Sequence, residues 1–211
     1  FLNKVFPDAL FIYLVRDPRA NINSIMDAWH SGHFRTYPNL PGFNGRWSLF
    51  LPPGWKSLSG KPIAEIASYQ WTVANQTILN DLNELNDKSR WKIVNYDQLI
   101  ESPKQVISEL CQFINLPMDT KLVQRVENGL PLSAYTLSKP GADKWHQKAQ
   151  SIAPNLPALQ PLIEQLNQAL GQSNQPLIDA SISSQVIEQA KALESTLLPQ
   201  LNASKNIADS I

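Results

Sequence analysis

Two short apolar runs, each followed at once by a helix signal, constrain the fold of this chain most. Residues 10–16 (LFIYLVR) form an unbroken apolar run that ends on an arginine, and its β-branched and aromatic content is typical of a strand buried on both faces. Asp17 and Pro18 then supply a helix N-cap and a first helical residue. A second run, residues 91–96 (WKIVNY), precedes another helical pattern. We therefore predict a three-layer α/β fold in which both runs are parallel strands.

The rest of the chain is predicted to be mostly helical. Helices are expected from Pro62 to about Asn86, over 101–117, over 119–128 and over 155–170. Residues 30–62 differ, because Gly, Pro and aromatic residues dominate them and they are too long for a plain connection. The residues leave two interpretations of this segment open: a lid or acceptor-binding loop that uses Trp47, Phe50 and Trp55, or a loop that these side chains simply pack down.

Composition excludes several classes of function. Lys and Arg number 18 and balance 18 Asp and Glu, so no overall basic charge points to a nucleic-acid partner. No apolar run approaches the roughly 20 residues of a membrane span, and no secretory signal is present. The single cysteine, Cys111, excludes an internal disulfide and is expected to pack in the core. We expect a cytoplasmic protein with no transmembrane segment; its oligomeric state stays open.

Arg16 is a candidate anion-binding residue. In parallel α/β sheets, ligands lie beyond the carboxyl ends of the strands, and the arginine stands at such an end, beside a helix N-terminus. Ser24 follows eight residues later, away from the apolar stripe of its helix, with its hydroxyl available to a ligand. An arginine fork and a hydroxyl suit a phosphate. The residues alone equally allow an ion pair of Arg16 with Asp17 or Asp97.

Three motifs resemble landmarks of the sulfotransferases that use 3′-phosphoadenosine-5′-phosphosulfate (PAPS). FPDALFIYLVRDPRANINSIMDAW is similar to their 3′-phosphate motif, which implies that Arg16 and Ser24 hold this phosphate. VNYDQLIESPKQVISEL is similar to a strand–helix landmark whose tyrosine lies near the adenine, which nominates Tyr96. SKPGADKW resembles the Lys-Pro and Lys-Trp of the tyrosylprotein-sulfotransferase branch, whose lysine folds over the nucleotide; this nominates Lys139. The motifs stand in the family's order over about residues 1–147.

The resemblance also implies what the chain lacks. Residues 1–175 would be the helix-rich C-terminal part of a P-loop-NTPase-like sulfotransferase domain, nearest to the bacterial and tyrosylprotein types, and 176–211 a helical tail. The phosphosulfate-binding loop and the catalytic base, a His or Glu in this family, are expected upstream of Phe1, so that the chain alone would be inactive. The catalytic residue is therefore unknown. His30, His33 and His146 are poor candidates for it, and no metal is expected.

The implied reaction is transfer of a sulfuryl group from PAPS to a hydroxyl or amine, with adenosine 3′,5′-bisphosphate as the product. A small molecule, a glycan, a lipid or a peptide all remain possible acceptors. Residues 134–146, around Lys139, are expected to form a loop that closes on the nucleotide. Two alternatives stay open: another nucleotide-binding α/β enzyme such as a small-molecule kinase, and a non-catalytic helical interaction module.

Overall fold

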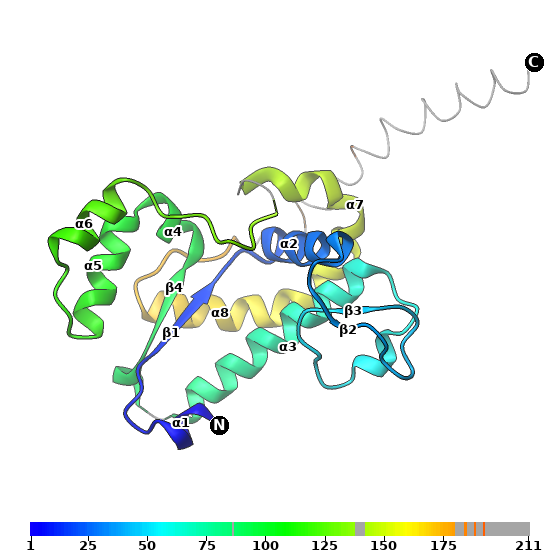
Figure 1. The fold of residues 1–211 in the computed structure, drawn as a ribbon, viewed down its shortest axis with the longest axis horizontal. Helices are drawn as coiled ribbons and strands as arrows, with labels where there is room; N and C mark the ends of the chain where they lie inside the picture. The colour runs from blue at the N-terminus through cyan, green and yellow to red at the C-terminus, as the bar shows by residue number, and fades with distance from the viewer. Residues whose placement is uncertain (86, 138–141, 180–183, 185–187, 189–191, 193–211) are drawn as a thin grey trace, which may run out of the picture. The chain divides into compact units, whose positions relative to one another are not determined.

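The chain folds as an α/β protein in which helices predominate (Figure 1). The computed structural model describes residues 1–85, 87–137 and 142–179, together with residues 184, 188 and 192. These residues fall into two compact units that alternate along the chain. The first unit contains 1–18, 72–137 and 161–178, and the second contains 19–71 and 142–160.

The first unit is built around a parallel pair of strands. β1 (Phe11–Val15) and β4 (Trp91–Asn95) pair in parallel from Phe11 opposite Trp91 to Val15 opposite Asn95, and they run side by side in Figure 1. This confirms the predicted α/β arrangement with parallel strands. Both strands end one residue earlier than predicted, so that Arg16 and Tyr96 follow the strands instead of closing them.

The two strands differ in burial. β4 is buried along almost its whole length, with Ile93 and Val94 inaccessible to solvent, as predicted. In β1, Tyr13 and Val15 enter the core, whereas Ile12 and Leu14 stay 48% and 45% exposed. Side chains alternate across a strand, and the core covers only the face that carries Tyr13. The prediction of a strand buried on both faces is therefore wrong for β1.

Most of the predicted helices are present. α2 begins at Pro18, as the N1 proline predicts, α3 covers the long helix expected from Pro62, and α5 buries Cys111 in the core as expected. α6 begins after Asp119, whose Oδ1 accepts a hydrogen bond from the Leu122 N–H at 2.8 Å. The helices that lie wholly or partly in the first unit are α1 (Leu2–Val5), α2 (Pro18–Ser31), α3 (Ile63–Glu84), the 3₁₀ turn η2 (Lys88–Arg90), α4 (Tyr96–Glu101), α5 (Pro103–Phe113), α6 (Thr120–Glu127) and α8 (Gln160–Gln172).

Polar contacts tie β1, α3 and α8 together in the first unit. The buried Tyr13 hydroxyl donates to Asn75 Oδ1 of α3 at 2.6 Å. Burial raises the pKa of the Tyr13 phenol above its ordinary value. Gln76 of α3 donates to Gln165 of α8 at 3.1 Å. α8 buries an apolar stripe at helical spacing, which consists of Leu162, Ile163, Leu166 and Leu170.

The second unit contains a small antiparallel sheet of β2 (Arg35–Tyr37) and β3 (Trp47–Ser48), the 3₁₀ turn η1 (Trp55–Leu58), and a run of short turns and helices: η3 (Ala142–Lys148), α7 (Ala149–Ile152) and η4 (Ala153–Leu159). The helix expected over 155–170 is therefore divided, and regular α-helix begins only at Gln160. Pro157 lies inside η4 and has no N–H to donate, which favours the tighter turn there. Within the described residues, every helix is too short or too polar to cross a bilayer.

Candidate functional site

Arg16 and Tyr96 meet at the carboxyl ends of the two parallel strands. Val15 and Asn95 form the last pair of the register, so the residues that follow each strand leave the same edge of the sheet together. The guanidinium carbon of Arg16 lies 4.7 Å from the centroid of the Tyr96 ring. Both side chains are half-buried. Two of the four candidate residues, far apart in the sequence, are thus in direct contact.

The chemistry of this pair suits a phosphate with a ring beside it. A guanidinium over the face of an aromatic ring is attracted by the negative charge of that face. Its N–H groups lie in the plane of the guanidinium and point outward from it, where they can meet a ligand. Such a fork is suited to a phosphate, and the phenol ring beside it offers an apolar surface to a base. The position also agrees with the rule that ligands lie beyond the carboxyl ends of parallel strands.

Asn95 holds the strand end from which Tyr96 departs. Its Oδ1 accepts from the backbone N–H groups of Asp97 at 2.8 Å and Gln98 at 3.3 Å, which caps α4. Its Nδ2 donates to the Pro176 carbonyl at 2.9 Å, and its own N–H donates to Gln175 Oε1 at 3.0 Å. This capping explains why Tyr96 begins a helix, although the sequence predicted it as the last residue of a strand.

We expect Asn95→Ala to lower the free energy of unfolding by about 2–3 kcal/mol, since it removes a helix cap and leaves buried backbone groups unsatisfied. Urea unfolding measures this loss. Asn128→Ala is the matched control, because Asn128 is an exposed asparagine of the same unit; it should change stability by less than about 0.5 kcal/mol. Equal losses for both variants would contradict an anchoring role for Asn95.

Ser24 lies in the second unit, in α2. Its Oγ donates a hydrogen bond to the Ala20 carbonyl, one turn earlier, at 3.0 Å. The expectation that this hydroxyl is available to a ligand is therefore wrong for the conformation described. A hydroxyl rotates about χ1, so Ser24 would have to exchange the Ala20 carbonyl for a phosphate oxygen in order to bind one.

A buried arginine that the sequence analysis did not single out also lies in α2. The guanidinium carbon of Arg19 lies 4.7 Å from the centroid of the Trp145 ring in η3, and both residues are buried. An ion pair between Asp27 of α2 and Lys148 of η3 adds a second tie. The Lys-Trp part of the third motif is thus fixed against the helix that carries Ser24. The only signal in the sequence was the second arginine of RDPRA, which resembles an ordinary surface residue.

Lys139 lies outside the described residues, as do its neighbours 138–141. Of the loop expected over 134–146, residues 134–137 are described and exposed, and residues 142–146 belong to η3. His146 packs edge-on against Trp145, with ring centroids 4.0 Å apart, whereas His30 and His33 are exposed. No group of three or more metal-ligating side chains occurs in the part of the chain that the structure describes.

Several aromatic side chains of the segment 30–62 pack together, although most residues of the segment are exposed. Trp47 is inaccessible to solvent and forms a core with Leu58 and Ile66. The rings of Trp29, Phe43 and Trp55 lie 4.9–6.4 Å from the Trp47 ring or from each other, in edge-on or tilted contacts. This arrangement supports the packing interpretation for Trp47. Phe50, by contrast, is 44% exposed.

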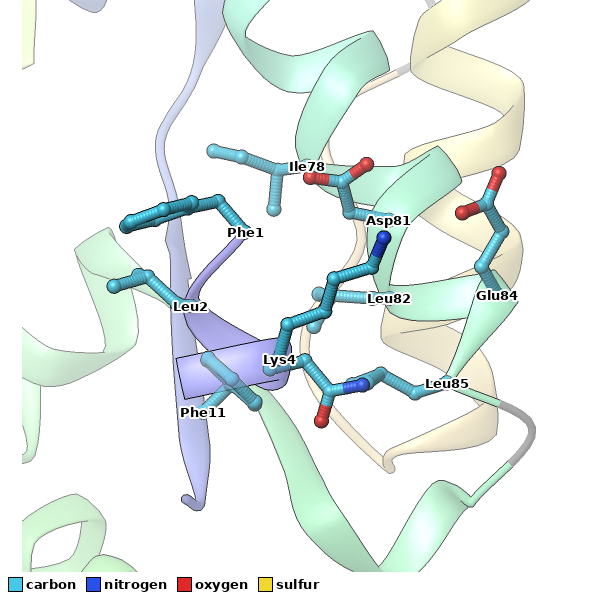
Figure 2. Close-up of a pocket in the computed structure, with 10 residues that line it drawn as sticks. Phe1, Leu2, Lys4, Phe11, Ile78, Asp81, Leu82, Glu84 and Leu85 are labelled. Carbon is cyan, nitrogen blue, oxygen red and sulfur yellow. The ribbon is translucent and has the colours of Figure 1, made fainter. Parts of the chain in front are cut away.

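A cavity of about 390 Å³ lies elsewhere in the first unit (Figure 2). Figure 2 shows Phe1, Leu2 and Phe11 on one side of it, and Asp81, Leu82 and Leu85 of α3 on the other. Neither Arg16 nor Tyr96 lines this cavity. It is mostly apolar, and we do not assign the nucleotide to it.

Comparison with known proteins identifies the family. No curated protein matches the chain. A solved structure, described as the sulfotransferase domain from the curacin biosynthetic pathway, is 28% identical, with a TM-score of 0.42 over 56% of this chain and 34% of that one. The chain thus spans about a third of that structure. A family model described as the sulfotransferase family matches residues 1–120, which is more than half of the 211 residues. The chain belongs to the sulfotransferase family.

Proposed function

We propose that the protein transfers a sulfuryl group from PAPS to a hydroxyl or amine acceptor and releases adenosine 3′,5′-bisphosphate. Membership of the sulfotransferase family supports sulfuryl transfer, and it favours this function over a kinase or a helical interaction module. The observation that carries the choice of donor is the contact of Arg16 with Tyr96 at the carboxyl edge of the parallel strands.

Each candidate residue has a defined part in this proposal. Arg16 binds the 3′-phosphate through charge-assisted hydrogen bonds, and the Tyr96 ring lies against the adenine. Ser24 contributes a hydroxyl to the same phosphate, after it has released the Ala20 carbonyl. Lys139 neutralises charge on the bound nucleotide, as the resemblance implies.

The residues present fit such a nucleotide, because a half-buried guanidinium and an aromatic face stand together where ligands of parallel sheets bind. PAPS supplies an activated sulfuryl group. The bond from sulfur to the bridging phosphate oxygen breaks as the acceptor oxygen or nitrogen bonds to sulfur, and the acceptor's proton passes to a base. Little covalent work is required of the protein, so positioning and charge stabilisation make up its contribution.

We further propose that residues 1–211 alone bind the nucleotide but do not catalyse the transfer. The resemblance assigns the phosphosulfate-binding loop and the base to a segment ahead of Phe1, and we do not propose His30, His33 or His146 as that base. In this proposal the acceptor binds against the segment 30–62.

The test is a transfer assay on the intact protein with sulfur-labelled PAPS. Phenols, sugars, long-chain alcohols and tyrosine peptides serve as acceptors, and binding of adenosine 3′,5′-bisphosphate is measured in parallel by calorimetry. We expect label on at least one acceptor class and saturable binding of the bisphosphate. Absence of both would refute the proposed function.

A further inference from the structure

Leu49 adopts a strained backbone conformation in the aromatic segment. Its φ of 65° lies in the left-handed region, which residues other than glycine avoid. Such strain persists only where the surroundings impose it, and it tends to gather at functional sites. In the second unit, the Leu49 N–H donates to the Phe34 carbonyl at 2.9 Å, and the Thr36 hydroxyl donates to the Leu49 carbonyl at 2.5 Å. The strained residue is thus held on both sides.

Gln70 of α3 fixes the two residues that flank Leu49. This side chain is completely buried, and its Nε2 donates to the carbonyls of Ser48 at 3.0 Å and Phe50 at 2.8 Å. Its Oε1 accepts from Trp29 Nε1 at 2.9 Å, which fixes the amide orientation. The Trp47 indole also donates to the Phe50 carbonyl, at 3.0 Å. A single amide therefore joins α2, α3 and the strained turn.

Packing alone does not account for this arrangement. The turn is strained, and a buried amide is committed to its carbonyls, yet the side chain that it presents, Phe50, is 44% exposed to solvent. The other tryptophans and phenylalanines of the segment are buried or half-buried. In a turn that serves only the core, such constraints would be expected to fix a buried side chain. A residue that contacts a ligand must instead be exposed and rigidly held.

We propose that Phe50 is a specificity-determining residue that contacts the acceptor, and that Gln70 is the residue that positions it. This inference rests on the proposed sulfotransferase function. An exposed phenyl ring offers an apolar face and no hydrogen bond, so it selects an acceptor with an aromatic or apolar portion beside its hydroxyl. A phenol fits this description better than a sugar, whose many hydroxyl groups need hydrogen-bond partners that a phenyl ring does not supply.

The test uses the intact protein saturated with adenosine 3′,5′-bisphosphate for binding, with 2-naphthol as the aromatic probe and N-acetylglucosamine as the polar one. Phe50→Ala should weaken the binding of 2-naphthol about ten-fold, the scale of one lost aromatic contact, and raise its Michaelis constant in the transfer assay equally. The Michaelis constant for PAPS and the binding of the bisphosphate should stay within two-fold. Phe6→Ala is the matched control, since Phe6 is an exposed phenylalanine of the first unit.

Gln70→Glu tests the positioning role. The carboxylate keeps the acceptor for Trp29 but loses both donors to the turn, so the dissociation constant of 2-naphthol should again rise about ten-fold, with bisphosphate binding retained. Gln76→Glu, the same change on the same helix, should leave both constants within two-fold. Retained bisphosphate binding shows that the unit with Arg16 and Tyr96 is folded, and an unchanged tryptophan fluorescence spectrum, to which Trp29 and Trp47 contribute, shows the same for the second unit.

The outcomes separate the two proposals. If the wild-type protein binds the bisphosphate but shows no saturable binding of 2-naphthol, or binds it equally well as Phe50→Ala, the inference is overturned while the proposed function stands. The same applies if Gln70→Glu binds 2-naphthol normally. If the wild-type protein neither binds the bisphosphate nor transfers label to any acceptor, the proposed function is overturned instead.

Discussion

Arg16→Ala should weaken binding of adenosine 3′,5′-bisphosphate by about 1.5–3 kcal/mol, or roughly ten- to hundred-fold. The variant removes a charge-assisted donor from the carboxyl edge of β1 and β4, and it leaves the Tyr96 ring without its cation. Calorimetric titration of the intact protein measures the loss. Adenosine 5′-phosphate, which lacks the 3′-phosphate, should bind almost equally well to variant and wild type.

The comparison of the two nucleotides makes this prediction specific. Equal losses for both would mean that Arg16 supports the fold or the adenine and does not read the 3′-phosphate. Arg125→Ala is the control for charge alone, because Arg125 is an exposed arginine in the last turn of α6, in the same unit. This variant should bind both nucleotides as the wild type does, apart from a small effect that added salt removes.

The sequence was sufficient to predict the parallel strands at whose ends the Arg16–Tyr96 contact forms. Two short apolar runs that each lead into a helix were predicted to be parallel strands of one sheet. The structure confirms that pairing, and it adds the contact of Arg16 with Tyr96, which the sequence pattern did not predict. The predicted end of the second strand was wrong by one residue, because Asn95 caps a helix there. The hydrophobic pattern of a sequence does not locate such a boundary to a single residue.

Other features depended on tertiary contacts that no local pattern encodes. The unbroken apolar run 10–16 predicted a strand buried on both faces. The run does not show which face the core covers, and Ile12 and Leu14 stay exposed. Ser24 lies where helical spacing predicts, yet its hydroxyl bonds to its own helix, which is a common local alternative for serine. The strained turn at Leu49 cannot be detected in the sequence, because Gln70 of α3, twenty-one residues later, holds the residues on either side of it.

Trp145→Ala should destabilise the second unit by about 3–5 kcal/mol, the usual cost of removing a buried tryptophan. Trp145 is buried, and its ring covers the buried guanidinium of Arg19, which would lose its aromatic partner. Urea unfolding measures the total loss of stability. Faster hydrogen exchange of the α2 amides would show the local loss. Arg19→Ala with Trp145→Ala completes a double-mutant cycle, in which we expect a coupling of about 1–2 kcal/mol for a desolvated cation–π pair.

Two variants separate the ring from the neighbouring charges. Trp145→Phe keeps an aromatic face above Arg19 and should recover a large part of the stability that alanine loses. Lys148→Met breaks the ion pair with Asp27 but leaves the ring, and because the two side chains are 28% and 31% exposed it should cost less than about 1 kcal/mol. If Lys148→Met were as destabilising as Trp145→Ala, the ion pair would be the main tie between η3 and α2. The aromatic–arginine contact then could not be the feature that fixes the Lys-Trp motif against the helix of Ser24.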